Sequence, residues 1–172
     1  MSDAADAPQL SVVLVSYQCR EDLLVTLDDL AQVAREVPIE VLVVDNASAD
    51  GSAAAVAARH PWVQLEALDE NLGFGVANNR AIRRARAQTV LILNPDTRLD
   101  AGAVRACLDE LARDRTVGVL SPRVVDEQGR LDPNCRRGFP TLWGTFCHVT
   151  GLDRLLRDRR SRRYTQGWLP LD

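Results

Sequence analysis

The sequence predicts an α/β fold with a mostly parallel sheet flanked by helices, and two observations carry that prediction. Over the first 120 residues, short apolar runs alternate with segments whose apolar residues recur at helical spacing. Two of the apolar runs, 41–44 and 90–93, end abruptly in the polar turns Asp45–Ser48 and Asn94–Asp96. Buried parallel strands are continuous runs of Val, Ile and Leu, and ligands bind where such strands end. The pattern therefore predicts a sheet with a polar binding edge.

Each element of this fold has its own signal. Strands are expected at residues 10–16, 40–45, 62–68, 88–94 and 116–120. Helices are expected at residues 21–36, from Asp50 to just before His60, at 74–87 and at 101–113. Leu23, Leu27 and Leu30 recur on one face of the first helix, and the second helix stops before His60-Pro61 because a residue that precedes proline disfavours the helical conformation. Residues 124–131 predict a short hairpin, and 142–156 have an amphipathic helical pattern.

Size and composition limit the class of protein. A chain of 172 residues with 46% hydrophobic content suits one domain with a sizeable core. The net charge of −3 argues against general nucleic-acid binding, and the use of arginine in place of lysine indicates a GC-rich genome. The four cysteines are widely spaced, which favours reduced thiols over disulfides or a zinc site. No apolar run approaches the ~20 residues that span a bilayer, so a cytoplasmic protein is expected.

Asp96 and Asp45 stand at the ends of two expected strands and are the main chemical candidates. A carboxylate at Asp96 could hold Mg²⁺ or Mn²⁺ against phosphates, because these hard cations take oxygen ligands. The Asn94 side chain could contact the same metal or a ribose. The alternative is that Asp96 or Thr97 caps the next helix. Asp45 could accept an N–H of a pyrimidine base, and the alternative there is an Asx-turn.

Further polar candidates lie at the same expected edge. Ser16 and Tyr17 end the first strand, where the Tyr17 ring could pack on a base; a partly buried tyrosine is the alternative. Gly73, in the loop that begins at Asn71, permits close approach of the backbone to a phosphate or sugar, and Asn78 follows on the next helix. The alternative for this loop is a turn with helix capping.

Four segments together resemble the family-2 glycosyltransferases, enzymes of the GT-A fold that use nucleotide-sugars. The segments are Leu10–Tyr17, Val43–Ser52, Asn71–Ala81 and Asn94–Asp96. The resemblance implies a Rossmann-like core over residues 1–122 that binds a nucleotide-sugar. In this core Asp45 would contact the base and Asp96 the metal, with Asn94 in place of the first acid of the common Asp-x-Asp motif. The segment around Cys135-Arg136-Arg137 narrows the resemblance to rhamnosyltransferase-like members.

The resemblance implies a bacterial, inverting glycosyltransferase in cell-surface polysaccharide synthesis. The expected donor is dTDP-rhamnose, with a UDP-sugar as the alternative, and the expected acceptor is a glycan or a lipid-linked glycan. The general base of the family lies in a later Glu-Asp motif, beyond a segment that resembles Trp168–Asp172, and nothing here matches that motif. We therefore expect a truncated donor-binding portion, with residues 123–172 beginning the acceptor side; an inactive nucleotide-sugar-binding remnant is the alternative.

The segment Arg154–Arg163 contains six arginines in ten residues. Basic residues are attracted to anionic lipid, so this run suggests peripheral contact with the inner face of the plasma membrane. The alternative is a solvated helix end, or a face that another segment covers.

Overall fold

The computed structural model describes residues 7–126, 128–132 and 139–156. The chain divides into two compact units, residues 1–115 (unit 1) and 116–172 (unit 2). The functional boundary expected at residue 122, within one structural domain, stays a prediction.

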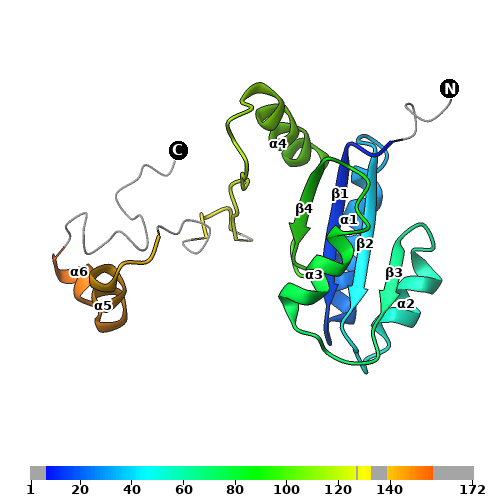
Figure 1. Ribbon diagram of the computed structural model, residues 1–172, viewed down its shortest axis with the longest axis horizontal. Helices are drawn as coiled ribbons and strands as arrows, with labels where there is room; N and C mark the ends of the chain where they lie inside the picture. Colours follow the sequence, from blue (N-terminus) through cyan, green and yellow to red (C-terminus); the bar gives the residue numbers. More distant parts are fainter. Residues whose placement is uncertain (1–6, 127, 133–138, 157–172) are drawn as a thin grey trace. The chain divides into compact units, whose positions relative to one another are not determined.

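Unit 1 contains a four-stranded parallel sheet in the order β3-β2-β1-β4 (Figure 1). Its strands are β1 (Leu10–Ser16), β2 (Ile39–Asp45), β3 (Gln64–Ala67) and β4 (Thr89–Leu93). β1 is central: Ser16 pairs with Asp45 of β2, and Leu14 pairs with Leu93 of β4. The carboxyl ends of β1, β2 and β4 therefore lie at one edge of the sheet.

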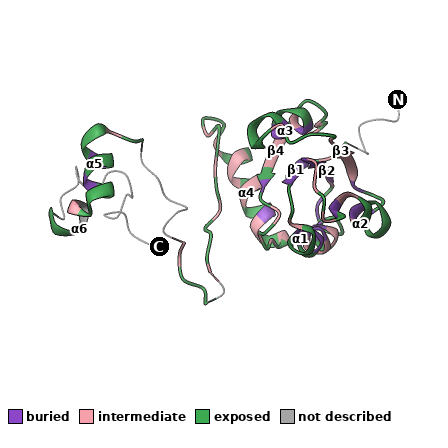
Figure 2. Ribbon diagram, turned by 90° about the horizontal axis from the view of Figure 1, so that it is seen from below, coloured by how far each residue is buried: buried purple, intermediate pink, exposed green. Residues whose placement is uncertain are grey.

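Helices cover both faces of this sheet. They are α1 (Arg20–Val33), α2 (Ser52–Arg59), α3 (Phe74–Ile82) and α4 (Ala101–Arg113). The larger apolar cluster joins the leucines of α1 with Val56 of α2 and Val104 of α4, and the smaller one joins the opposite face of the sheet with Ala77 and Ala81 of α3. Figure 2 shows this arrangement, with α3 on one side of β1 and β2 and with α1 and α2 on the other.

Burial explains why β1 and β2 are continuous apolar runs. Every residue of β1 is buried, and so is every residue of β2 after Ile39. Val12 and Leu14 belong to the larger cluster, whereas Val13 and Val15 belong to the smaller one. Because successive side chains of a strand point to opposite faces, a strand between two helical layers must be apolar at nearly every position.

One expected strand is wrong. Residues 116–120 form no strand, and Val119 in this segment is 92% exposed. A β-strand needs a neighbouring strand, and none of the strands that the structure describes pairs with this segment, so the apolar composition of these residues alone was misleading. The helix expected at 74–87 also ends earlier, at Ile82, where the chain continues in a turn that includes Arg83 and Arg84.

The described part of unit 2 contains an isolated β-bridge and two short helices. The expected hairpin is a single antiparallel bridge between Val125 and Leu131. The helix expected at 142–156 is interrupted: α5 (Leu142–Thr150) and α6 (Leu152–Leu156) are separated by Gly151, whose φ of +75° favours glycine.

Several sequence candidates of unit 2 lie outside the described residues. These are Cys135–Arg137, Trp168–Asp172 and the arginine-rich run beyond residue 156. Among the helices that the structure describes, none has the length and apolar character to cross a membrane.

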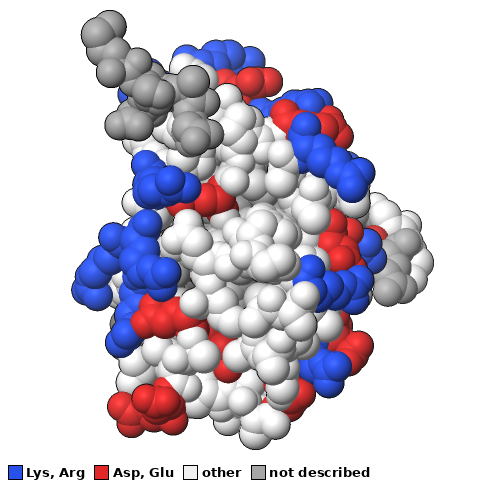
Figure 3. All heavy atoms as spheres, turned by 90° about the vertical axis from the view of Figure 1, so that its right-hand side faces the viewer, with Lys and Arg blue, Asp and Glu red and all other residues white. Residues whose placement is uncertain are grey.

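Charged side chains on the surface of unit 1 form ion pairs. Glu66 contacts both Arg80 and Arg84, and Arg59 contacts Asp28. On the face in Figure 3, basic and acidic side chains accordingly lie next to one another around an uncharged area. Exposed pairs of this kind contribute only ~0–1 kcal/mol each, so the apolar layers dominate the stability of the fold.

A buried carboxylate at the amino end of β2 ties several elements together. Glu40 Oε1 accepts hydrogen bonds from Ser11 Oγ at 2.5 Å and Arg86 N at 2.6 Å, and Oε2 accepts from Arg86 Nε at 2.8 Å and Gln64 Nε2 at 3.0 Å. Burial alone would raise the pKa of Glu40, but the hydrogen bonds from Ser11, Arg86 and Gln64 outweigh it and lower the pKa from 4.5 to about 2. The Glu40 carboxyl group is therefore charged in the folded protein at neutral pH.

We predict that Glu40→Gln lowers the free energy of unfolding by roughly 2 kcal/mol at pH 7. The folded pKa lies below the unfolded value of 4.5, so the unfolded chain binds more protons between these values and the wild type loses this stabilisation as the pH falls. Urea unfolding at pH 7 and pH 3.5 should show a smaller acid loss in the variant. Glu36→Gln, at a half-exposed pair with Arg105, is the control; an equal effect of both variants would contradict the role of Glu40.

Candidate functional site

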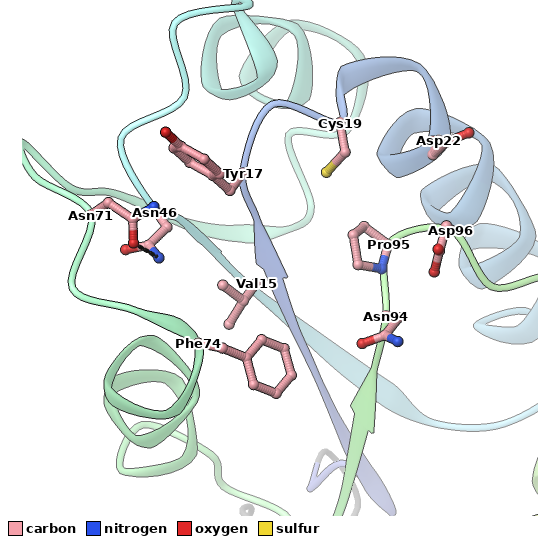
Figure 4. A pocket seen from close by; sticks show the side chains of 10 residues that line it. All are labelled: Val15, Tyr17, Cys19, Asp22, Asn46, Asn71, Phe74, Asn94, Pro95 and Asp96. Carbon is pink, nitrogen blue, oxygen red and sulfur yellow. Dashed lines mark hydrogen bonds between the residues drawn. The ribbon is translucent and has the colours of Figure 1, made fainter. Parts of the chain in front are cut away.

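A hollow of about 380 Å³ opens at the carboxyl edge of the sheet in unit 1. It is bordered by the ends of β1 and β2, the start of α1, the segment that leads into α3, and the turn after β4 (Figure 4). The lining residues are Val15, Tyr17, Cys19, Asp22, Asn46, Asn71, Phe74, Asn94, Pro95 and Asp96. Segments far apart in the sequence therefore meet here because of the strand register.

The turn after β4 presents Asp96 to the hollow. Thr97 N donates to Asn94 O at 3.2 Å across this turn, and Pro95 occupies its second position, which proline favours because its φ is fixed. Asn94 and Asp96 are exposed, and the Asp96 carboxylate accepts no hydrogen bond from any residue that the structure describes. The carboxylate is thus available to a ligand.

The alternative reading of Asp96 or Thr97 as a helix cap is wrong. The residue that caps α4 is Asp100, whose Oδ1 accepts from Ala103 N at 2.9 Å. The turn that contains Asp96 lies before that cap. Helix capping therefore does not explain why a carboxylate stands at the end of β4.

Asp45 lies behind the wall of the hollow. Its side chain is buried, at 3% exposure, and Oδ2 accepts from Ser48 N at 3.0 Å, a local bond that stabilises the turn but reaches three residues on rather than the two of the alternative Asx-turn. Oδ1 is buried and has no hydrogen-bond partner among the described residues. A buried carboxylate oxygen without a donor is costly, so this atom is suited to accept an N–H group from outside the chain.

The last residues of β1 separate into a buried and an exposed candidate. Ser16 is fully buried, with Oγ 3.6 Å from Cys19 Sγ, and its carbonyl oxygen accepts from Asn46 N at 2.8 Å. Tyr17 is 52% exposed and borders the hollow, as Figure 4 shows. Ser16 therefore supports the wall, while the ring of Tyr17 is accessible to a ligand.

Asn46 fastens the loop before α3 to the end of β2, a role that the sequence analysis missed. Its Nδ2 donates to Asn71 Oδ1 at 2.7 Å, and its Oδ1 accepts from Leu72 N at 2.9 Å. Asn71 Oδ1 also accepts from Gly73 N at 2.9 Å, at a glycine with a φ of +80°. The expected binding loop is thus held by the side-chain amides of Asn46 and Asn71, and only Asn71 of this pair was a sequence candidate.

Asn78 is buried in α3 and does not line the hollow. Its Nδ2 donates to Phe74 O at 2.9 Å within the helix, whereas its Oδ1 is buried without a partner among the described residues. The structure therefore brings four sequence candidates into the lining of the hollow and leaves four outside that lining. The first set is Tyr17, Asn71, Asn94 and Asp96, and the second is Ser16, Asp45, Gly73 and Asn78.

The hollow also contains groups that no sequence motif singled out. Asp22 comes from the first turn of α1, and Figure 4 shows it on the same side of the hollow as Asp96. Val15 and Phe74 give the hollow an apolar part opposite these acids. The only sequence signal for Asp22 is an acidic residue in the first turn of a helix. Because many surface helices have such an acid, this signal does not mark a site.

Oxygen ligands for a hard cation are present, but a complete protein cage is not. Within the described residues, no group of three or more His, Cys, Asp or Glu side chains lies close enough to hold a metal ion. Asp96 offers an unpaired carboxylate and Asn94 an amide oxygen. This donor set fits Mg²⁺ or Mn²⁺ only when a bound phosphate group completes the coordination.

We predict that Asn46→Ala lowers the free energy of unfolding by about 1–3 kcal/mol, because it leaves Asn71 Oδ1 with one donor fewer and Leu72 N without its acceptor. Asn79→Ala is the matched control, since Asn79 is exposed on α3 and alanine is a better helix former. Urea unfolding measures both. A loss no larger than that of the control would show that Asn46 does not hold the loop.

Comparison with known proteins identifies the family to which these segments correspond. Residues 11–164 match the profile of Glycosyl transferase family 2. The chain is 34% identical over 144 residues to N-acetylglucosaminyl-diphospho-decaprenol L-rhamnosyltransferase of Mycobacterium tuberculosis strain H37Rv, covering 77% of this chain and 46% of the relative. It is 34% identical over 125 residues to succinoglycan biosynthesis protein ExoO of Rhizobium meliloti strain 1021, covering 72% of this chain and 36% of the relative. The chain thus spans less than half the length of either relative.

Solved structures share the fold. Mannosyltransferase PcManGT from Pyrobaculum calidifontis, in complex with GDP-Man and Mn²⁺, aligns with a TM-score of 0.57 at 30% identity, covering 65% of this chain and 34% of that one. S. aureus TarS 1–349 aligns with a TM-score of 0.54 at 22% identity, covering 62% and 33% respectively. Both neighbours have the GT-A fold, so the expected GT-A fold is confirmed.

Proposed function

The chain belongs to glycosyl transferase family 2, and we propose that it binds the nucleotide-sugar donor of an inverting glycosyl transfer in the hollow of unit 1. One observation carries the proposal: Tyr17 after β1, Asp96 after β4 and Asn71 in the loop before α3 meet at one edge of a parallel sheet. In open α/β sheets this edge is where ligands bind. The lining is polar beside the acids and apolar around Val15 and Phe74, which suits a molecule that carries both a diphosphate and a ring.

In this proposal the base lies at the ends of β1 and β2. Asp45 Oδ1 lacks a donor, and a pyrimidine base offers an N–H group that satisfies it. The exposed ring of Tyr17 supplies a flat apolar surface for stacking. Because Asp45 Oδ1 is covered in the structure, binding requires the atoms above it to move aside.

The diphosphate lies at the turn after β4. Asp96 and the Asn94 amide oxygen would hold Mg²⁺ or Mn²⁺ together with the phosphate oxygens. When bound, the cation supplies charge neutralisation for the diphosphate that leaves. The protein's own part is to hold the Asp96 carboxylate unpaired and exposed beside the place where that charge develops.

In the proposed reaction, an acceptor hydroxyl attacks the anomeric carbon of the sugar, and the bond to the diphosphate breaks. The proton of the attacking hydroxyl must pass to a general base. No residue of this chain is assigned that role, because the family motif that carries the base has no match in the sequence. Donor binding and turnover are therefore tested separately, and an inactive nucleotide-sugar-binding protein is an outcome that the second test can return.

We propose dTDP-rhamnose as the donor and a glycan or lipid-linked glycan as the acceptor. The support is the mycobacterial relative, an N-acetylglucosaminyl-diphospho-decaprenol L-rhamnosyltransferase. Helix α5 exposes Leu142, Trp143, Phe146 and Val149, a surface suited to an apolar partner such as a lipid. A lipid-linked acceptor would place the reaction at the inner face of the plasma membrane, in cell-surface polysaccharide synthesis.

The test is thermal unfolding of the chain with UDP, dTDP, GDP and dTDP-rhamnose, each with and without MnCl₂. A ligand at a hundred times its dissociation constant stabilises by about 2.7 kcal/mol, which shifts the melting temperature of a domain this size by roughly 5–10 °C. We expect a Mn²⁺-dependent shift with dTDP that is larger than with GDP. Absence of a shift with every nucleotide would contradict the proposal.

Asp96→Asn should abolish the Mn²⁺-dependent part of that shift, because it removes the carboxylate while keeping the shape of the side chain. Asp109→Asn, at an exposed position of α4 outside the hollow, is the matched control and should leave the shift unchanged. Release of dTDP from dTDP-rhamnose in the presence of an acceptor then distinguishes an enzyme from a protein that only binds the donor.

A further inference from the structure

The buried face of α1 contains one polar side chain among its leucines. Thr26 is 1% exposed, and its neighbours on this face, Leu23, Leu27, Leu30 and Val33, are all apolar and buried. A hydroxyl group at such a position is costly unless it is hydrogen-bonded. A single threonine in an apolar helical stripe is not a motif, so Thr26 was not a candidate from the sequence.

The hydroxyl of Thr26 contacts the turn that contains Asp96. Its Oγ1 lies 2.6 Å from Pro95 O and 3.1 Å from Thr97 O, so its single proton is donated mainly to Pro95 O and partly to Thr97 O. These two carbonyl groups flank Asp96 in the chain. A residue that lies 69 positions earlier in the sequence than Pro95 thus holds the backbone on both sides of the exposed carboxylate.

A second residue of α1 holds the chain just after the turn. Asp29, three positions beyond Thr26, accepts from Arg98 Nε at 2.5 Å, from Arg98 Nη2 at 2.8 Å and from Leu99 N at 3.4 Å. The hydrogen bonds from Arg98 lower the pKa of Asp29, so the carboxylate remains charged at neutral pH. The segment from Pro95 to Leu99 is therefore fastened to α1 at two successive points.

The turn has little else to fix it. Pro95 has no N–H group, and within the turn the structure records the single backbone hydrogen bond from Thr97 N to Asn94 O at 3.2 Å. Removal of the Thr26 hydroxyl leaves two carbonyl groups without their donor and frees the backbone on either side of Asp96. The contacts of α1, rather than the turn alone, determine where the Asp96 carboxylate lies.

We infer that Thr26 is a positioning residue for the diphosphate and metal part of the site: its hydroxyl fixes the backbone that carries Asp96. The inference rests on the proposed function for its ligand, but the contact that it describes is independent of any ligand. A displaced carboxylate would bind Mn²⁺ and the diphosphate less well, whereas contacts to the base at the ends of β1 and β2 would be unaffected.

The experiment compares Thr26→Val, which has nearly the same shape but no hydroxyl, with Thr26→Ser, which retains it. The first readout is the dissociation constant of dTDP with saturating MnCl₂. We expect Thr26→Val to raise it about tenfold and Thr26→Ser to remain close to the wild type, because in Thr26→Val the ligand must order a turn that the hydroxyl otherwise holds, at a cost of about one hydrogen bond. The second readout is hydrogen exchange at the Thr97 amide, which should accelerate in Thr26→Val and stay slow in Thr26→Ser.

Val33→Ala is the control for a general loss of stability, because Val33 is buried on the same helix and contacts the core instead of the turn. It should lower the melting temperature without changing either readout. The inference is overturned if Thr26→Val binds dTDP as the wild type does, or if Val33→Ala gives the same weakening and the same exchange. Should the wild type bind no nucleotide, the proposed function fails, and unchanged exchange at Thr97 in Thr26→Val would separately overturn the positioning role.

Discussion

Parallel pairing of β1 with β2 on one side and β4 on the other is the constraint on which the rest of the structure depends. The register places Ser16 opposite Asp45 and Leu14 opposite Leu93, so three chain segments leave the sheet at one edge. Because side chains alternate between faces, a slip of one residue would invert the contacts of every residue in a strand. The buried hydrogen bond from Ser11 Oγ to Glu40 Oε1 joins two residues that are paired in this register, so a slip would break it, and the register thereby fixes the positions of Tyr17 and Asp96.

The two ends of the sheet are built differently. At the amino end, Glu40 is buried, and both of its carboxylate oxygens accept hydrogen bonds from β1, β3 and the segment before β4. These bonds leave no carboxylate oxygen of Glu40 for a ligand. At the carboxyl end, Asp96 is exposed and unpaired among the described residues, and the turn that carries it is held from outside by α1. A carboxylate that serves stability is thus satisfied within the chain, whereas one proposed to serve binding is left unsatisfied.

Much of unit 1 could be predicted from the sequence, because continuous apolar runs and helical spacing report burial directly. β1 was expected at its observed bounds, and the polar ends of β2 and β4 marked the edge that carries the hollow. The roles of Asn46 and Thr26 could not be predicted, since each depends on hydrogen bonds to residues far along the chain, which leave no periodic signal. The strand predicted at residues 116–120 is wrong for a related reason, since an apolar composition does not reveal whether a neighbouring strand is there to pair with it.

The central claim is that the turn after β4 binds a divalent cation together with the diphosphate of a nucleotide. Paramagnetic broadening by Mn²⁺ in the amide NMR spectrum of the chain tests it most directly. We predict that the signals of Asn94, Asp96 and Thr97 broaden at low Mn²⁺ concentration only when dTDP is present, because the described residues alone offer too few ligands. Broadening that is centred elsewhere, or that is the same with and without dTDP, would contradict it.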